Sequence, residues 1–277
     1  MTSPEEEIRS CVLTIAGSDS GGNAGVQADL RAFHAYGLHG CTVFAALTAQ
    51  NPFEVSAIHD VPASFVAAQL DAVLGCYSIK ALKTGMLASA PVIEVVADRI
   101  GRHTEIAKVV DPVMIATSGA RLISDDAAEV LVRLLLPQAT LITPNLPEAE
   151  VLAGGGLDSA ARAADADRAE YLARVLHGRF GCAVLVKGGH GAGDSAVDVL
   201  FDGTDVRRFT MPMIENPVST HGTGCSLAAA LAAELALGHD LPSAVAGAKG
   251  YVHEAIRTSY LVGKNCGVLG FARRKRG

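Results

Sequence analysis

Residues 219–238 join a glycine-bracketed turn directly to an alanine-rich segment that is typical of a helix. Gly222 and Gly224 flank Thr223, so the backbone is free of Cβ clashes and several N–H groups can converge on one point. The unpaired amides of a helix's first turn face the same way and favour an anion such as phosphate. The stretch therefore predicts an anion-binding turn at residues 222–224.

Cys225 falls in the first turn of this predicted helix, where its thiol could take part in proton transfer. The positive end of the helix dipole favours a thiolate by about 0.3–1 kcal/mol, or up to ~2 kcal/mol when partly buried. Because one pKa unit corresponds to about 1.36 kcal/mol, we expect the helix start to make Cys225 a usable base near neutral pH. The alternative is a glycine turn that caps a core helix, with the cysteine as a small buried apolar residue.

The elements that position this turn follow from the hydrophobic pattern. Within the helix, Leu227, Leu231 and Leu235 recur at i+4 and are expected to bury one face, and the intervening alanines allow close packing on a sheet. Before it, short apolar strands alternate with amphipathic helices. Strands are predicted at residues 11–16, 42–47, 55–59, 79–84, 109–110, 140–143 and 183–187. Helices are predicted at residues 26–33 (with Val26, Leu30 and Phe33 facing inward), 63–74, 92–100, 126–136 and 168–180.

This alternation predicts an α/β fold with a mostly parallel sheet covered by helices on both faces. Residues 197–201 and 206–211 resemble a hairpin, the one clear antiparallel feature of the pattern. The chain shows neither a linker nor an internal repeat, so we expect a single domain over residues 1–277, with its core at about 11–261.

Polar segments follow most of the predicted strands, and ligands bind beyond the carboxyl ends of the strands in such sheets. One edge of the sheet is therefore expected to collect these segments. They are GSDSGGNAG (17–25), TAQN (48–51), GM (85–86), DPVM (111–114), TPNLPEAE (143–150), KGGH (187–190) and GTGC (222–225).

Composition excludes several classes of protein. A hydrophobic content of 49% and 19% charged residues are ordinary for a globular enzyme. A net charge of -6 without a long basic stripe argues against a nucleic-acid partner. The acidic start MTSPEEEIRS and the lack of a long apolar run argue against a signal peptide and a membrane span, so a cytoplasmic location is expected. The six cysteines are scattered singly, which fits reduced thiols better than a zinc site or disulfides.

The motifs together, in this order and spacing, closely resemble those of the hydroxymethylpyrimidine and phosphomethylpyrimidine kinases of thiamine biosynthesis, in the ribokinase-like superfamily. The resemblance runs from about residue 12 to residue 256. It implies a three-layer α/β/α sandwich without a separate lid domain, a homodimer, and ATP with Mg²⁺ as co-substrate and metal. It also implies transfer of the ATP γ-phosphate first to the pyrimidine hydroxymethyl group and then to the resulting monophosphate.

The resemblance implies roles for individual residues. It assigns the catalytic turn to Gly222, Thr223, Gly224 and Cys225, with Cys225 as the base that accepts the hydroxymethyl proton. Contacts to the pyrimidine are expected from Gln50, Asp29, Gly17, Met86 and Val113. Contacts to ATP are expected from Asn145, Lys187, Lys249 and Thr220. The metal positions are Asp111 and Glu148.

Plainer interpretations stand beside these roles. Asp29 alone would be a solvated helix carboxylate, Glu148 a first-turn helix acid, and His190 and His221 residues that cap loops. A pyridoxal kinase of the same fold is the main alternative function. A pyrimidine or nucleotide sensor without enzymatic activity is a further alternative, but such a protein could lose Asp111, Glu148 or Cys225, and this chain keeps all three. A thiol hydrolase would need a histidine and acid in a recognised acyl-transfer signature, which the sequence lacks.

Overall fold

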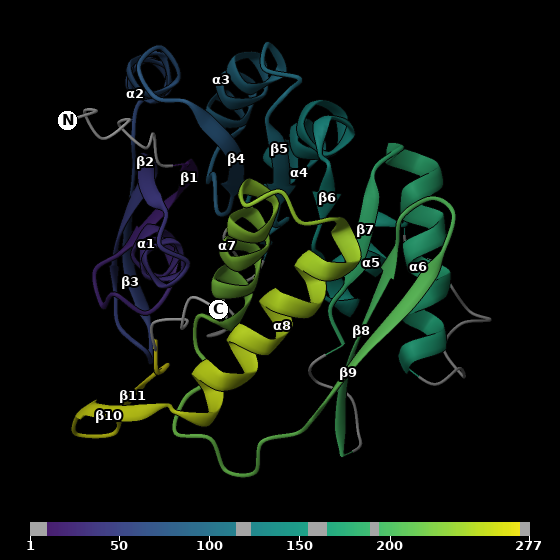
Figure 1. Ribbon diagram of the computed structural model, residues 1–277. Helices are drawn as coiled ribbons and strands as arrows, with labels where there is room; N and C mark the ends of the chain where they lie inside the picture. Colours follow the sequence, from purple (N-terminus) through teal and green to yellow (C-terminus); the bar gives the residue numbers. More distant parts are fainter. Residues whose placement is uncertain (1–9, 115–122, 155–164, 189–193, 272–277) are drawn as a thin grey trace, which may run out of the picture.

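The computed structural model describes residues 10–114, 123–154, 165–188 and 194–271. Nine strands form one sheet in the order β3-β2-β1-β4-β5-β6-β7-β8-β9 (Figure 1). Along this order, every pair of neighbouring strands between β2 and β7 is parallel. At one side of the sheet β3 pairs antiparallel with β2, and at the other side β8 pairs antiparallel with both β7 and β9. Their bounds are β1 Cys11–Asp19, β2 His39–Gln50, β3 Val55–Asp60, β4 Ile79–Thr84, β5 Ala107–Val110, β6 Leu141–Ile142, β7 Ala183–Val186, β8 Ser195–Phe201 and β9 Val206–Pro212.

Helices cover both faces of this sheet. One face carries α1 (Gly25–Ala35), α7 (Thr223–Ala236) and α8 (Leu241–Arg257), of which α7 and α8 lie in front of the sheet in Figure 1. The other carries α2 (Ala63–Leu74), α3 (Ala90–Gly101), α4 (Asp125–Val130), α5 (Leu146–Leu152) and α6 (Asp165–Phe180). A small separate hairpin pairs β10 (Tyr260–Gly263) with β11 (Cys266–Val268). The described chain is thus a three-layer α/β/α sandwich.

The two hydrophobic cores follow from the alternation of side chains along the central strands. In β1, Val12 packs with the α1, α7 and α8 side, whereas Leu13 and Ile15 pack with the opposite side. All three side chains are fully buried, because a central parallel strand is covered on both faces. No helix in the described ranges is both long enough and apolar enough to cross a membrane.

The fold class predicted from the sequence is confirmed, including the hairpin of β8 and β9. The predicted strand at residues 79–84 and helix at residues 63–74 have the bounds of β4 and α2. The hairpin is not the one antiparallel feature, because β2–β3 and β7–β8 also pair antiparallel. The predicted helix over residues 126–136 continues beyond α4 as a π-helical turn at Leu131–Leu135 and a short 3-10 turn at Leu136–Gln138.

Two predictions of helix burial were only partly correct. In α1, Val26 and Phe33 are buried as predicted, but Leu30 is 37% exposed, and Asp29 is buried in its place. In α7, Leu227 and Leu231 are buried as predicted, but Leu235 is only partly buried and residues 228–233 are all fully buried, so burial is not confined to one face. The reason is tertiary, because α7 packs against the sheet, α1 and α8 at once. Small alanine side chains permit this close approach.

Candidate active site

A cavity of about 540 Å³ opens at the carboxyl ends of the parallel strands, as expected for this class of sheet. All site residues proposed from the sequence line it except Asp29. They are Gly17, Gln50, Met86, Asp111, Val113, Asn145, Glu148, Lys187, Thr220, Gly222, Thr223, Gly224, Cys225 and Lys249. His190 lies outside the described residues.

The predicted anion turn forms the start of α7. Gly222 is the N-cap residue and has φ +88°, a left-handed conformation that favours glycine. A Cβ at this position would lie 1.9 Å from the carbonyl oxygen of Asn23, so the turn and the loop after β1 touch through their backbones. The absence of a side chain at Gly222 is therefore required both by its φ and by its neighbour.

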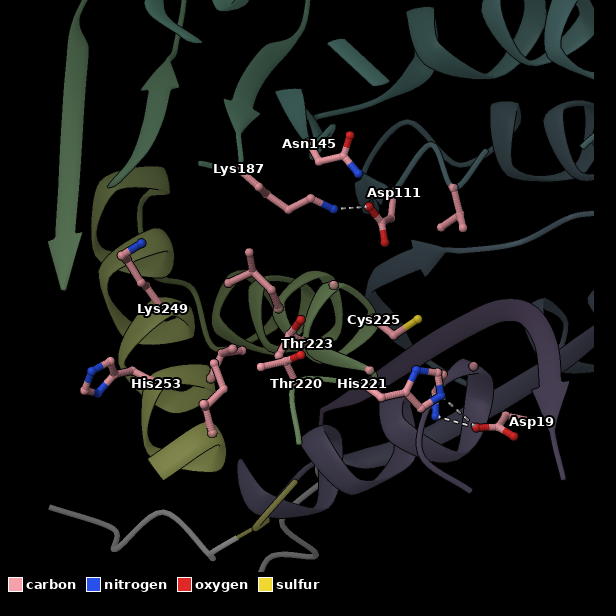
Figure 2. Close-up of a pocket in the computed structure, with 18 of the residues that line it drawn as sticks. Asp19, Asp111, Asn145, Lys187, Thr220, His221, Thr223, Cys225, Lys249 and His253 are labelled. Carbon is pink, nitrogen blue, oxygen red and sulfur yellow. Dashed lines mark hydrogen bonds and ion pairs between the residues drawn. The ribbon is translucent and has the colours of Figure 1, made fainter. Parts of the chain in front are cut away.

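Lys187 and Asp111 point toward each other above the start of α7 (Figure 2). The Lys187 Nζ atom lies 2.9 Å from Asp111 Oδ1, and the Thr143 hydroxyl donates to the same oxygen at 3.0 Å. Although burial lowers the pKa of Lys187, the nearby carboxylates of Asp111 and Glu148 outweigh it and hold that pKa above its usual range. The raised pKa favours the charged form of Lys187, which lies near Gly224 at the start of α7.

Asn145 and Glu148 form a reciprocal cap at the start of α5. The Asn145 side chain accepts a hydrogen bond from the Glu148 amide, and the Glu148 carboxylate accepts one from the Asn145 amide, both at 2.8 Å. The interpretation of Glu148 as a first-turn helix acid is therefore correct, and the residue lines the cavity as well. Burial raises the pKa of Glu148, Lys187 lowers it and Asp111 raises it further.

Asp29 lies behind the cavity wall, paired with a lysine that the sequence analysis did not select. Its carboxylate accepts hydrogen bonds from Lys83 Nζ at 2.9 and 3.1 Å and from the Thr14 hydroxyl at 2.5 Å. The side chains of Asp29 and Lys83 are both fully buried, so Asp29 is not a solvated carboxylate. Lys83 lines the cavity in its place, and the one signal for it in the sequence is a lysine inside the buried strand β4.

The environment of Cys225 differs from the sequence expectation. Burial raises the pKa of the Cys225 thiol, the positive charge of Lys83 opposes this effect, and Asp29 and Asp111 add to it. The net pKa lies above the ordinary thiol value, so the helix start alone does not make Cys225 a base near neutral pH. Lys83 is the group that favours the thiolate most strongly at this position.

Lys249 was expected to contact ATP, and in the ligand-free protein it is paired with an acid. Its Nζ atom lies 2.7 Å from Asp198 Oδ2, and both side chains are buried. The other oxygen of Asp198 accepts a hydrogen bond from the amide of Gly188 at 3.0 Å. Asp198 also lines the cavity and was missed by the sequence analysis, and the signal for it in the sequence is that it is the one charged residue inside the strand β8.

Asp19 is the second acid that the sequence analysis left without a role. It is buried at the end of β1 and accepts hydrogen bonds from the amides of Gly21, Asn23 and Ala24. It also lies near His221, which is more than a loop cap because it lines the cavity beside Gln50.

Comparisons with known proteins show which family the chain resembles in sequence and in fold. The family model described as phosphomethylpyrimidine kinase matches residues 19–270. The hydroxymethylpyrimidine/phosphomethylpyrimidine kinase of Rhizobium meliloti is 48% identical over 88% of this chain and 89% of its own length. The thiamine biosynthesis bifunctional protein ThiED of Geobacter sulfurreducens is 47% identical over 94% of this chain, which spans 51% of that longer protein.

A solved structure of Bacillus subtilis pyridoxal kinase in complex with ADP is also similar. It shares 33% sequence identity, has a TM-score of 0.85, and the match covers 96% of this chain and 98% of that one. Because the family model matches most of the chain, the chain belongs to the phosphomethylpyrimidine kinase family.

Proposed function

We propose that this protein transfers the γ-phosphate of ATP to 4-amino-5-hydroxymethyl-2-methylpyrimidine and then to the resulting monophosphate, in thiamine biosynthesis. The observation that carries the proposal is one cavity lined by two chemically different sets of residues. The predicted anion turn, Lys187 and Asp111 form one set, and Gln50 and Met86 belong to the other. Phosphoryl transfer needs positioning and charge neutralisation, which such a cavity supplies.

In the proposed reaction, the hydroxymethyl oxygen forms a bond to the γ-phosphorus while the bond from that phosphorus to the bridging oxygen of ADP breaks. The amides of residues 222–224 and the Lys187 ammonium stabilise the charge on the transferred group. Cys225 accepts the hydroxymethyl proton, with Lys83 favouring its thiolate. In the second round, a phosphate oxygen of the monophosphate is the nucleophile.

Asp111 and Glu148 are the residues that would hold Mg²⁺. Asp111 follows β5 and Glu148 lies in the first turn of α5, and both carboxylates line the cavity. Carboxylates suit a hard ion that keeps several waters and binds substrate phosphates. When bound, Mg²⁺ supplies positive charge to the phosphates during transfer. Asn145, Thr220 and Lys249 line the same cavity and are proposed to contact ATP.

Changing Glu148 to glutamine is expected to raise the Mg²⁺ concentration for half-maximal rate by about 10-fold, because it removes a metal-directed charge. The glutamine oxygen still accepts the Asn145 amide, so the cap of α5 is kept. The measurement is a Mg²⁺ titration of the initial rate at fixed ATP. Glu150→Gln, on the same helix but outside the cavity lining, is the control. An unchanged requirement in Glu148→Gln would exclude it as a metal position.

Steady-state kinetics with Mg-ATP test the substrate. The expected result is a kcat/KM for hydroxymethylpyrimidine, and for its monophosphate, at least about 10²-fold above that for pyridoxal, because a cavity built to hydrogen-bond one ring edge rejects another strongly. A preference for pyridoxal would favour the alternative function, to which the structural similarity with pyridoxal kinase gives weight. If the protein phosphorylates none of these three compounds, both the proposed function and the alternative are contradicted.

We also propose that the protein is a homodimer. Large apolar side chains are exposed along the edge formed by β2, β3 and α2, and such surface tends to mark an interface. They are Leu47, Phe53, Ile58 and Phe65, which are 45–62% exposed. Light scattering at micromolar concentration tests this, and a mass equal to one chain of 28.5 kDa would contradict it.

A further inference from the structure

Three side chains from separate parts of the chain, Asp19, His221 and Gln50, form a series of polar contacts in the cavity wall. The His221 Nε2 atom lies 3.8 Å from Asp19 Oδ2 and 3.5 Å from the side-chain amide nitrogen of Gln50. Figure 2 shows His221 and Asp19 facing each other beside the anion turn. The series therefore links the turn that would bind phosphate to the residue proposed to read the pyrimidine ring.

Asp19 is an ionised acceptor in this series. Burial raises the pKa of its carboxyl, but the contact with His221 and the three hydrogen bonds from the backbone amides outweigh burial and hold the pKa below its usual value. The negative charge of this carboxylate lies 3.8 Å from Nε2, beyond hydrogen-bond distance, and it favours a proton on the His221 nitrogen that faces it.

The surroundings of the other imidazole nitrogen, Nδ1, also indicate that the proton is on Nε2. His221 Nδ1 is buried and has no hydrogen-bond partner among the described residues. A buried N–H without a partner is rarer in proteins than a buried acceptor without one. The arrangement that avoids an unpaired N–H has a lone pair on Nδ1 and the proton on Nε2.

Thr48 fixes the orientation of the neighbouring carboxamide independently. Its hydroxyl lies 2.8 Å from the Ser18 carbonyl oxygen, and also 3.1 Å from one terminal atom of the Gln50 side chain. A hydroxyl has one proton, and a carbonyl oxygen can only accept it. The structure places Gln50 Oε1 toward Thr48 and the amide nitrogen toward His221, an assignment that a half-turn of the carboxamide exchanges. When Thr48 donates to Ser18, the Gln50 atom that faces Thr48 must be the NH₂ group, so the half-turn applies and the carbonyl Oε1 faces His221.

We propose that His221 carries its proton on Nε2 and donates it to Gln50 Oε1, with the nearby negative charge of Asp19 favouring that protonation, so that the carboxamide of Gln50 keeps one orientation. His221 and Asp19 are then positioning residues that act through Gln50. The inference rests on the proposed function in so far as Gln50 reads the pyrimidine.

The consequence of a fixed carboxamide is selectivity. A carboxamide presents a donor and an acceptor side by side, and a half-turn about its last bond exchanges them. A freely turning Gln50 can adapt to a ring edge with either order of donor and acceptor. A fixed carboxamide matches the order of donor and acceptor on one class of ring. Against a ring with the opposite order it leaves polar groups unpaired, and unpaired polar groups are the reason that such a ring is bound much more weakly.

The protonation of His221 can be measured without any substrate. Nitrogen NMR of the protein with isotope-labelled histidine distinguishes a proton on Nε2 from one on Nδ1, and loss of the signal in His221→Gln assigns it. The expected result is a proton on Nε2 in the ligand-free protein. A neutral ring protonated on Nδ1 alone would overturn the proposal, whatever the enzyme's substrate proves to be.

Two variants of His221 separate positioning from a structural role. In His221→Leu, the KM for hydroxymethylpyrimidine is expected to rise about 10-fold, and its preference over pyridoxal to fall by a similar factor, because one polar contact is lost. The kcat and the KM for ATP should change less than about 2-fold. In His221→Gln, an N–H donor is kept, so most of the affinity and preference should return.

Two control variants give the largest and the smallest expected change in the KM for the pyrimidine. Gln50→Ala removes the carboxamide itself and sets the largest expected rise in the pyrimidine KM. His59→Asn changes an exposed histidine of β3 outside the cavity lining and should leave both constants unchanged. Equal losses in His221→Leu and His221→Gln, or a KM for ATP that rises in parallel with that for pyrimidine, would overturn the role in positioning Gln50.

Discussion

Replacing Cys225 with alanine is expected to lower kcat by about 10²–10⁴-fold while ATP and the pyrimidine remain bound, because removing a general base typically costs that much in rate. The amides of residues 222–224 and the start of α7 are backbone features that survive the change. Proton acceptance is lost, whereas the anion site is kept. Steady-state kinetics together with calorimetric dissociation constants measure the two effects separately.

Serine should not restore turnover at this position. Its hydroxyl has nearly the right shape, but its proton is much harder to remove than that of a thiol. Because burial raises the pKa of Cys225 against the pull of Lys83, the thiolate fraction increases with pH above neutrality. The kcat of the unmodified enzyme should rise over the same range, and this rise should be absent in Cys225→Ala.

Cys76→Ala, which changes an exposed thiol, is the matched control and should keep full activity. If Cys225→Ser retains nearly full kcat, Cys225 is a structural part of the anion turn and the base is another group.

Gly222→Ala is expected to lower kcat/KM by at least about 10²-fold and, unlike Cys225→Ala, to weaken ATP binding as well. A left-handed conformation costs a residue with a Cβ about 1–2 kcal/mol. The new Cβ would also lie 1.9 Å from the Asn23 carbonyl oxygen, so the loop after β1 or the turn itself has to move. Moving the turn displaces the amides that are proposed to hold the phosphates.

Gly238→Ala separates the cost of the left-handed conformation from the effect of the close contact with Asn23. Gly238 has φ +86°, nearly the same as Gly222, but a Cβ there would meet nothing within 4 Å. It lies just beyond the other end of α7, so this variant should lose roughly 1–2 kcal/mol of folding free energy and keep its activity. Denaturant unfolding and ATP titrations of the two variants are the measurements. Equal ATP affinity in both would show that the close contact with Asn23 does not maintain the anion site.

The sequence determined those features whose physical cause is local. The apolar runs of β4 and α2 are bounded by turn residues and have the predicted ends. The glycines around Thr223 predicted a turn at the start of a helix, which the structure has, because the requirement for a positive φ lies within a few consecutive residues. The alternation of strands and helices was likewise sufficient to place most candidate residues at one edge of the sheet.

Tertiary structure alone decided which charges face each other. Asp29 is a buried partner of Lys83 because β1 lies between β2 and β4 and α1 packs over it, an arrangement that helical periodicity in α1 does not contain. The periodicity instead predicted Leu30 as an inward side chain, and it is partly exposed.

The same holds for the chemistry of the site. The helix start suggested a lowered pKa for Cys225, but the pKa depends more on burial and on the charges of Lys83, Asp29 and Asp111, which come from other elements. Asp19, His221 and Gln50 meet because the end of β1, the turn before α7 and the end of β2 converge at one place. Contacts between residues so distant in the chain leave no periodic signal in the sequence, because the packing of the sheet and helices brings them together.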